Sequence, residues 1–147
     1  MKKERKPEFE FFIPETLKET LLPLFSAKIS AGFPSPAEDF IEQRLDLNKY
    51  LIKNPSSTFL VKVNGESMKN AGILNGDILI VDRSINPTDK TIILCVLNGE
   101  FTVKRISKRG EKLFLIPEND QFKPIEIVDG MDFRVWGVVV FAIHKMK

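Results

Sequence analysis

Ser67 and Lys104 are the residues whose types and surroundings best suit nucleophilic chemistry in this 147-residue chain. Ser67 follows an apolar stretch and stands two residues after Gly65. A serine in such a place can expose its hydroxyl and turn backbone N–H groups toward a bound carbonyl oxygen. The alternative interpretation is a turn serine or a helix N-cap, which is a common role for serine after a strand.

Lys104 is the candidate base for this serine. A lysine accepts a proton only when it is uncharged, and its ordinary pKa of about 10.4 falls when the amine is buried. In the alternating stretch 100–106, Lys104 shares a face with Thr102, opposite Phe101 and Val103. The alternative is a solvent-facing lysine on an amphipathic strand. The amino-acid pattern leaves both interpretations open.

Other reactive side chains are scarce. The chain has one histidine, His144, and one cysteine, Cys95. We expect His144, beside Lys145 and near the chain end, to be exposed, and Cys95, inside an apolar stretch, to be a buried and unreactive thiol. One cysteine forms no internal disulfide, and one His and one Cys make no zinc cage, so we expect no metal and no cofactor.

The composition indicates a cytoplasmic domain with a substantial core. Apolar residues make up 43% of the chain, and 22 basic residues stand against 20 acidic ones. No apolar run reaches the about 18 residues of a membrane helix, and charges interrupt the N-terminus where a secretory signal needs an apolar stretch. The near balance of charge does not favour strong nonspecific binding to nucleic acid.

Short β-strands are predicted to position Ser67 and Lys104. Runs of β-branched and aromatic residues alternate with turn residues, and Asn-Gly pairs between such runs favour hairpins. The predicted strands are residues 58–63, 78–82, 91–97, 100–106, 113–116, 125–128 and 133–143. Residues 138–143 are apolar on both faces, so the domain itself or a second subunit must cover both.

Residues 1–57 are expected to form an extended arm, because prolines interrupt them repeatedly. We predict one short helix from Leu47 to Lys53, with Asp46 as its N-cap. The sequence LLPLF at residues 21–25 is an apolar patch that either covers the domain's own surface or docks on another protein.

The motifs around the two candidate residues resemble the LexA/UmuD family of self-cleaving serine peptidases. The resemblance lies in VNGESM at residues 63–68, GILNGDILIVD at 72–82, GEFTVKR at 99–105, LIPEN at 115–119 and GVVV at 137–140. The spacing between Ser67 and Lys104 also fits. The chain departs from the family at residues 69–71, where a proline is common and this chain has KNA.

The resemblance implies a mostly β fold: a LexA/signal-peptidase-like domain of short strands with an extended N-terminal arm. It implies that Ser67 is the nucleophile and Lys104 the general base. The backbone N–H groups of Ser67 and Glu66 would hold the oxyanion of the reaction intermediate.

The sequence AGFPSPA at residues 31–37 resembles the UmuD cleavage region and implies a cut between Ala31 and Gly32. The chain then divides into residues 1–31, an arm removed on self-cleavage, residues 32–57, an extended linker with the short helix, and residues 58–147, the β-rich peptidase domain.

The resemblance also implies a role and partners. The processed form would be an accessory subunit of an error-prone translesion DNA polymerase in the SOS DNA-damage response. The partners would be a second copy in a homodimer, the RecA filament on single-stranded DNA as activator, a UmuC-like Y-family polymerase and the replication sliding clamp, with Leu24 and Phe25 as the clamp anchors.

Two alternatives remain at this point. The chain is a non-cleaving binding module that docks a polymerase or a clamp, or it is a general signal-peptidase-like protease, which the lack of a membrane anchor disfavours. The 31 residues before the predicted cut, interrupted by prolines, are too few for a helical DNA-binding head. We therefore expect no sequence-specific DNA binding.

Overall fold

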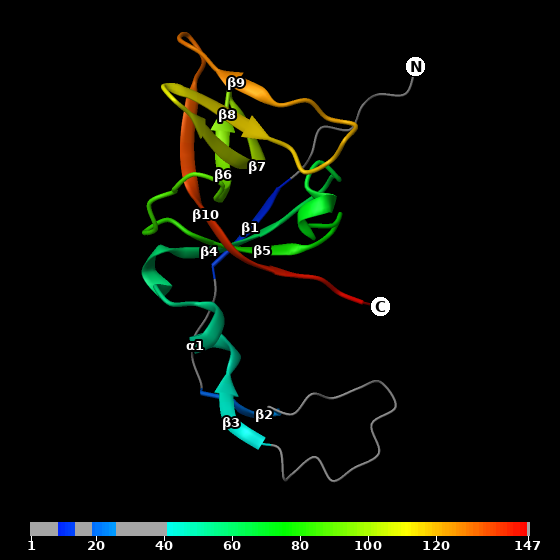
Figure 1. The fold of residues 1–147 in the computed structure, drawn as a ribbon. Helices are drawn as coiled ribbons and strands as arrows, with labels where there is room; N and C mark the ends of the chain where they lie inside the picture. The colour runs from blue at the N-terminus through cyan, green and yellow to red at the C-terminus, as the bar shows by residue number, and fades with distance from the viewer. Residues whose placement is uncertain (1–8, 14–18, 26–40, 147) are drawn as a thin grey trace. The chain divides into compact units, whose positions relative to one another are not determined.

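The computed structural model describes residues 9–13, 19–25 and 41–146, and they fall into two compact units (Figure 1). The larger unit comprises residues 1–14 and 54–147, and the smaller one residues 15–53. The predicted cleavage pair, Ala31 and Gly32, lies outside the described residues. The predicted boundary at residue 31 is a cleavage site and the one at residue 57 is the end of the linker, and both stay predictions.

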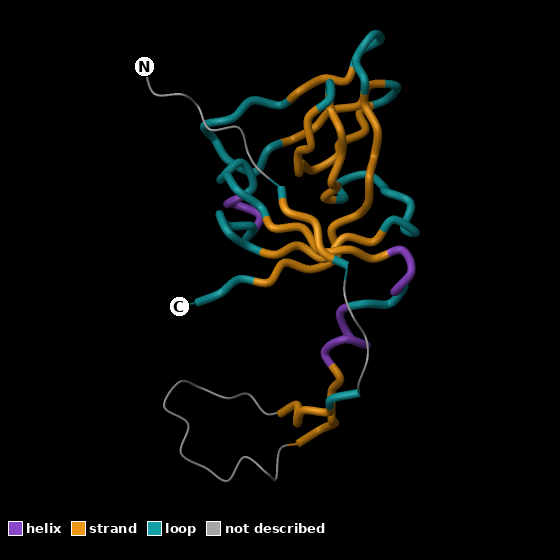
Figure 2. Tube along the Cα trace, turned by 180° about the vertical axis from the view of Figure 1, so that it is seen from behind, coloured by secondary structure: helices purple, strands orange, loops and turns teal. Residues whose placement is uncertain are grey.

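The larger unit is built around one antiparallel sheet, so the predicted mostly β fold is confirmed (Figure 2). Its described strands follow the order β1-β4-β5-β10-β6-β7-β8-β9. They are β1 (Glu10–Phe12), β4 (Thr58–Lys62), β5 (Ile78–Asp82), β6 (Ile92–Leu97), β7 (Glu100–Arg109), β8 (Lys112–Ile116), β9 (Ile125–Ile127) and β10 (Phe133–Ile143). Single 3-10 turns at Pro55–Ser57 and Lys69–Ala71 complete the unit.

The turn between β6 and β7 fixes the register that places Lys104. Asn98 and Gly99 both have positive φ, 49° and 82°, as a two-residue hairpin turn with the right twist requires. The strands therefore pair Cys95 with Thr102 and Ile93 with Lys104. Directly opposed residues share a face of the sheet, so Lys104 lies over the same face as these two buried residues of β6.

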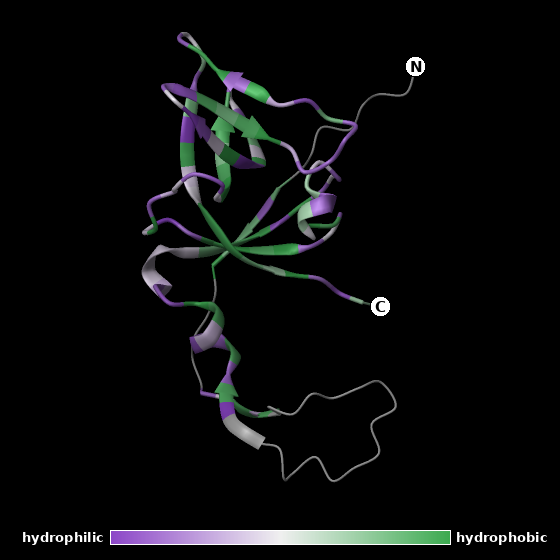
Figure 3. Ribbon diagram, in the orientation of Figure 1, coloured by the Kyte–Doolittle hydropathy of each residue, from purple (hydrophilic) through white to green (hydrophobic). Residues whose placement is uncertain are grey.

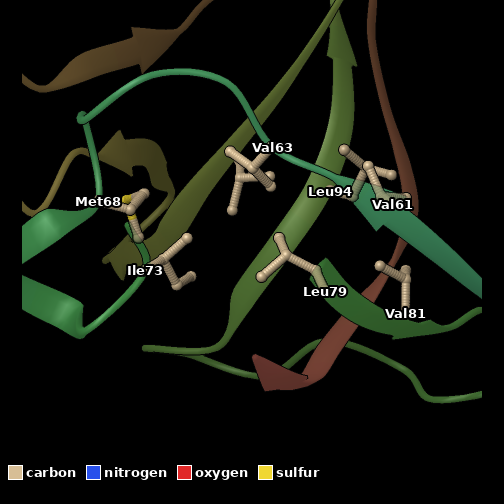
Figure 4. Close-up of a cluster of buried hydrophobic side chains, with 8 residues drawn as sticks. Val61, Val63, Met68, Ile73, Leu79, Val81 and Leu94 are labelled. Atoms are coloured by element: carbon tan, nitrogen blue, oxygen red, sulfur yellow. The ribbon is translucent and has the colours of Figure 1, made fainter. Parts of the chain in front are cut away.

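The core consists of apolar side chains from strands that are distant in sequence. One cluster joins Val61 of β4, Leu79 and Val81 of β5, and Leu94 of β6 with residues of the loop after β4 (Figure 4). A second cluster includes Ile93 and other residues of β6, β7, β8 and β10. Hydropathy follows this arrangement, since much of β5, β6 and β10 is hydrophobic while the turns are mainly hydrophilic (Figure 3).

β10 crosses the middle of the sheet between β5 and β6. A Cβ on Gly137 would lie 2.6 Å from Val81, so glycine lets β10 approach β5, and the register between β10 and β6 shifts just before Gly137. Val138 is buried, but Ile143 at the strand's end is 44% exposed. A single chain therefore covers the doubly apolar stretch 138–143 only in part.

The smaller unit is a hairpin of β2 (Leu21–Phe25) and β3 (Ile41–Asp46) followed by helix α1 (Leu47–Leu51). The predicted N-cap is confirmed, because the Asp46 carboxylate accepts a hydrogen bond from the Asn48 backbone N–H at 3.0 Å. The helix ends at Leu51 rather than Lys53. Among the described residues, no helix is long and apolar enough to cross a membrane.

The pairing of the arm segments was missed by the sequence analysis. β1 pairs with β4, and the Phe11 ring packs 5.1 Å from Phe101 and 5.9 Å from Phe59. These strands are short and interrupted by charge or proline, so their sequence alone does not distinguish a paired strand from an extended arm.

Candidate active site

Ser67 lies on a closed loop between β4 and β5. The Val63 N–H donates to the Asp77 carbonyl at 2.9 Å, and the Gly76 N–H donates to the Val63 carbonyl at 2.7 Å, so the two ends of the loop are tied together. Met68 and Ile73 are buried at one end of the first core cluster and anchor the loop from inside (Figure 4). Met68, the residue after Ser67, is thus fixed in the core, and this holds the Ser67 hydroxyl in place.

Lys104 of β7 reaches this loop. Its Nζ lies 3.0 Å from the Ser67 Oγ, 2.7 Å from the Thr102 Oγ1 and 3.0 Å from the Val103 carbonyl oxygen. A neutral amine has two N–H groups and one lone pair. It can donate to Thr102 and to the Val103 carbonyl while its lone pair faces the Ser67 hydroxyl proton, which is the arrangement a general base needs.

Burial favours the neutral form of this amine. Lys104 is only 8% exposed, and this desolvation lowers its pKa from the ordinary value. A charged Cys95 would raise the pKa of Lys104, but burial raises the pKa of the Cys95 thiol itself to about 12. Cys95 is therefore uncharged wherever the lysine titrates, and the effect of burial prevails.

The apolar surroundings of Lys104 come from a strand that the sequence analysis did not consider. The amino-acid pattern left open whether Lys104 is buried or exposed. The register adds β6, where Ile93 and Cys95 are fully buried on the face that Lys104 shares. Cys95 is the buried free thiol that was expected.

The N–H groups predicted to bind the oxyanion lie at the start of a tight turn. The Glu66 carbonyl accepts a hydrogen bond from the Lys69 N–H at 3.2 Å, which closes the turn around Ser67. Within the part of the chain that the structure describes, neither the Glu66 N–H nor the Ser67 N–H donates a hydrogen bond. Both remain able to bind an incoming oxygen.

His144 is exposed, as expected, but its side chain has a partner. Its Nδ1 lies 2.6 Å from the Oδ1 of Asp77, whose side chain is 1% exposed against 40% for the histidine. The cause is the pairing of β10 with β5. The two strands are antiparallel with Ile143 opposite Ile78, so His144, which follows Ile143, lies opposite Asp77, which precedes Ile78. Asp77 also accepts from the Leu74 N–H at 2.8 Å, within the loop that carries Ser67.

The other predicted site residues are distant in sequence from Ser67 and Lys104. Leu24 and Phe25 belong to β2 of the smaller unit, and the Leu24 side chain is exposed. Among the described residues, no three His, Cys, Asp or Glu side chains gather as a metal site. The sequence did not identify two residues as part of the site. Thr102 contacts Lys104, and strand alternation already placed the two on one face. Asn119, in the LIPEN motif, contacts the loop of Ser67.

Comparison with known proteins supports the motif resemblance. The chain matches the family described as Peptidase S24-like over residues 23–140. It is 41% identical to the protein ImpA of Salmonella typhimurium over 133 residues, 85% of each chain. It is 38% identical to the protein SamA of Salmonella typhimurium over 129 residues, 88% of this chain and 89% of SamA. It is 40% identical to the LexA repressor of Photorhabdus laumondii over 124 residues, 84% of this chain and 59% of that repressor.

Proposed function

Because the chain belongs to the Peptidase S24-like family, we propose that it cleaves itself with Ser67 as nucleophile and Lys104 as general base. The observation that carries this proposal is the 3.0 Å contact between the Lys104 Nζ and the Ser67 Oγ, made by an amine whose pKa burial lowers. No other described lysine has both a buried amine and a nucleophile as its neighbour.

The chemistry follows from these positions. Lys104 takes the hydroxyl proton while the Ser67 Oγ bonds to the carbonyl carbon of Ala31. The N–H groups of Ser67 and Glu66 hold the resulting oxyanion, and one such donor is worth about 3–4 kcal/mol. Lys104 then gives its proton to the nitrogen of Gly32 as the peptide bond breaks. This step frees the amine of Gly32 and leaves Ala31 bound to Ser67 as an ester. Water then hydrolyses that ester, which releases residues 1–31, restores the Ser67 hydroxyl and leaves a chain that begins at Gly32.

The processed protein is proposed to serve as an accessory subunit of an error-prone translesion polymerase in the SOS response. The resemblance of the motifs to the LexA/UmuD family supports this role. The proposed setting is the cytoplasm, with the RecA filament on single-stranded DNA as activator and a UmuC-like Y-family polymerase as partner. The arm would be held near Ser67 only part of the time, so that the filament can shift the balance toward cleavage.

Contact with the replication sliding clamp is proposed through β2. Leu24 is exposed there, and Phe25 follows it in the same strand. An apolar pair on a short segment suits an apolar pocket on a partner.

The experiment is self-cleavage of the purified full chain, followed by intact-mass spectrometry between pH 6 and pH 10.5, with and without activated RecA filament. The wild type is expected to yield a product starting at Gly32, faster as pH rises until the Lys104 amine is neutral, because only the neutral amine can accept the proton of Ser67. Ser67→Ala and Lys104→Arg are expected to yield none, since a guanidinium keeps its proton in this range.

The matched control is Ser107→Ala, which removes a serine hydroxyl from β7, the strand of Lys104. It should cleave at the wild-type rate. A fragment from Ser67→Ala, a cut elsewhere or a rate that ignores pH would refute the proposal. Complete absence of cleavage, with the fold intact, would favour the non-cleaving binding module instead.

A further inference from the structure

Asn119 is a buried polar residue that contacts the loop of Ser67. It lies between β8 and β9 and is 4% exposed. Its Nδ2 donates to the Glu66 carbonyl at 2.8 Å, and its Oδ1 accepts from the Gln121 backbone N–H at 3.0 Å. Because the oxygen end faces an N–H donor, the amide can be placed only with its NH₂ group toward Glu66.

The bond to Glu66 acts on the peptide unit that contains the Ser67 N–H. The chain has no cis peptide among its described residues, so the Glu66 carbonyl and the Ser67 N–H point in opposite directions within one rigid plane. Holding the carbonyl from one side therefore aims the N–H to the other. A hydrogen bond to the carbonyl also polarises the unit and strengthens its N–H as a donor.

The segment that carries Asn119 is itself bound to residues near Ser67 and near Lys104 in the chain. The Glu118 carbonyl accepts from the Asn70 N–H at 2.8 Å, just after Ser67. The Glu118 carboxylate pairs with the Arg105 guanidinium, and Arg105 follows Lys104 on β7. Asn119 thus holds the Glu66 carbonyl from a support that is fixed relative to the base.

We propose that Asn119 is a positioning residue that orients the Glu66–Ser67 peptide so that the Ser67 N–H binds the oxyanion. This inference rests on the proposed self-cleavage. It assigns Asn119 to stabilisation of the intermediate and not to the protonation of Lys104. The two assignments predict different pH profiles.

The test is the rate of self-cleavage against pH for Asn119→Asp and Asn119→Ala, with folding checked by circular dichroism and thermal melting. Asn119→Asp keeps the shape but turns an oxygen toward the Glu66 carbonyl. Both variants are expected to lower the plateau rate at alkaline pH by about 10- to 100-fold, up to the effect of losing one oxyanion donor. In Asn119→Ala the midpoint of the profile should not move, because no charge near Lys104 changes. In Asn119→Asp the new carboxylate favours the charged amine, so only its plateau is compared.

Gln121→Ala is the matched control, because it removes an exposed side chain but leaves the backbone N–H that Asn119 binds. It should cleave like the wild type. Asn119→Ser, which retains a small donor, should fall between wild type and Asn119→Ala, and it provides the test if the other two variants do not fold.

The outcomes separate the two proposals. Wild-type cleavage with an unchanged plateau in the folded variants would overturn the role of Asn119 alone. A lower plateau together with a shifted midpoint in Asn119→Ala would also overturn it, since Asn119 would then act on the base. No cleavage by the wild type would overturn the proposed function, and this inference with it.

Discussion

The Thr102 Oγ1 lies 2.7 Å from the Lys104 Nζ, two residues away on the same face of β7. This contact is shorter than the one between the amine and Ser67, so Thr102 directs the amine toward the loop. Strand alternation creates this neighbourhood before any tertiary contact forms, because side chains two residues apart lie on one face.

Thr102→Val should slow self-cleavage by about 10-fold, since it keeps the shape of the side chain but removes the acceptor that orients the base. The midpoint of the pH–rate profile should move to lower pH. A hydrogen bond to the ammonium favours the charged form, and losing it lowers the pKa of Lys104 further. Rates measured from pH 6 to 10.5 test both effects. A midpoint shifted upward would show that Thr102 does not accept from the amine.

Lys104→Met should raise the free energy of unfolding at pH 7 by about 1 kcal/mol, the lower range of the penalty for burying a polar group. Burial lowers the pKa of Lys104 in the folded state below the unfolded value of 10.5. The unfolded chain therefore binds more protons between those two values, and wild-type stability rises with pH across that window.

Urea unfolding of the uncleaved chains checks this, with Ser67→Ala as the background so that no protein is lost to processing. The gain from Lys104→Met should be largest below the folded pKa and should shrink toward pH 10.5. A destabilised Lys104→Met, or a gain that does not depend on pH, would contradict burial as the cause.

His144→Ala should lower the free energy of unfolding by about 1 kcal/mol, because the buried Asp77 carboxylate loses a hydrogen-bond partner. The exposure of the histidine keeps the effect near the low end of such losses. Lys145→Ala, at the next exposed position, is the control and should change stability little. Equal urea midpoints for the two variants would mean that the pair with Asp77 does not stabilise the fold.

The protein should sediment as a homodimer at micromolar concentration. The reason is that β10 is apolar on both faces near its end, and a single chain leaves Ile143 there exposed. A stable interface buries about 800 Å² on each partner. Ile143→Glu should shift the equilibrium toward monomer, while Met146→Glu, in the exposed tail, should not. A wild-type monomer would argue against this interface.

The strands of the larger unit from β4 to β10 were predictable because their signals are local. The stretch 78–82 and the last strand 133–143 were placed at their observed bounds, and the Asn98-Gly99 turn fixed the pairing of Cys95 with Thr102. The same local patterns carried the family resemblance, which the family match confirms. Turn geometry and strand alternation depend on neighbouring residues, so the amino-acid order is sufficient for them.

What the tertiary structure decided is which distant residues meet. The sequence allowed Lys104 to be exposed, and its burial beside Ser67 follows from how β4, β6 and β7 pack in the larger unit. Asn119 reaches the Glu66 carbonyl because the segment after β8 packs on the Ser67 loop, and His144 reaches Asp77 because β10 pairs with β5. Such contacts depend on strand order and register across the whole unit. No local pattern encodes them, since each side chain's burial is set by segments tens of residues away.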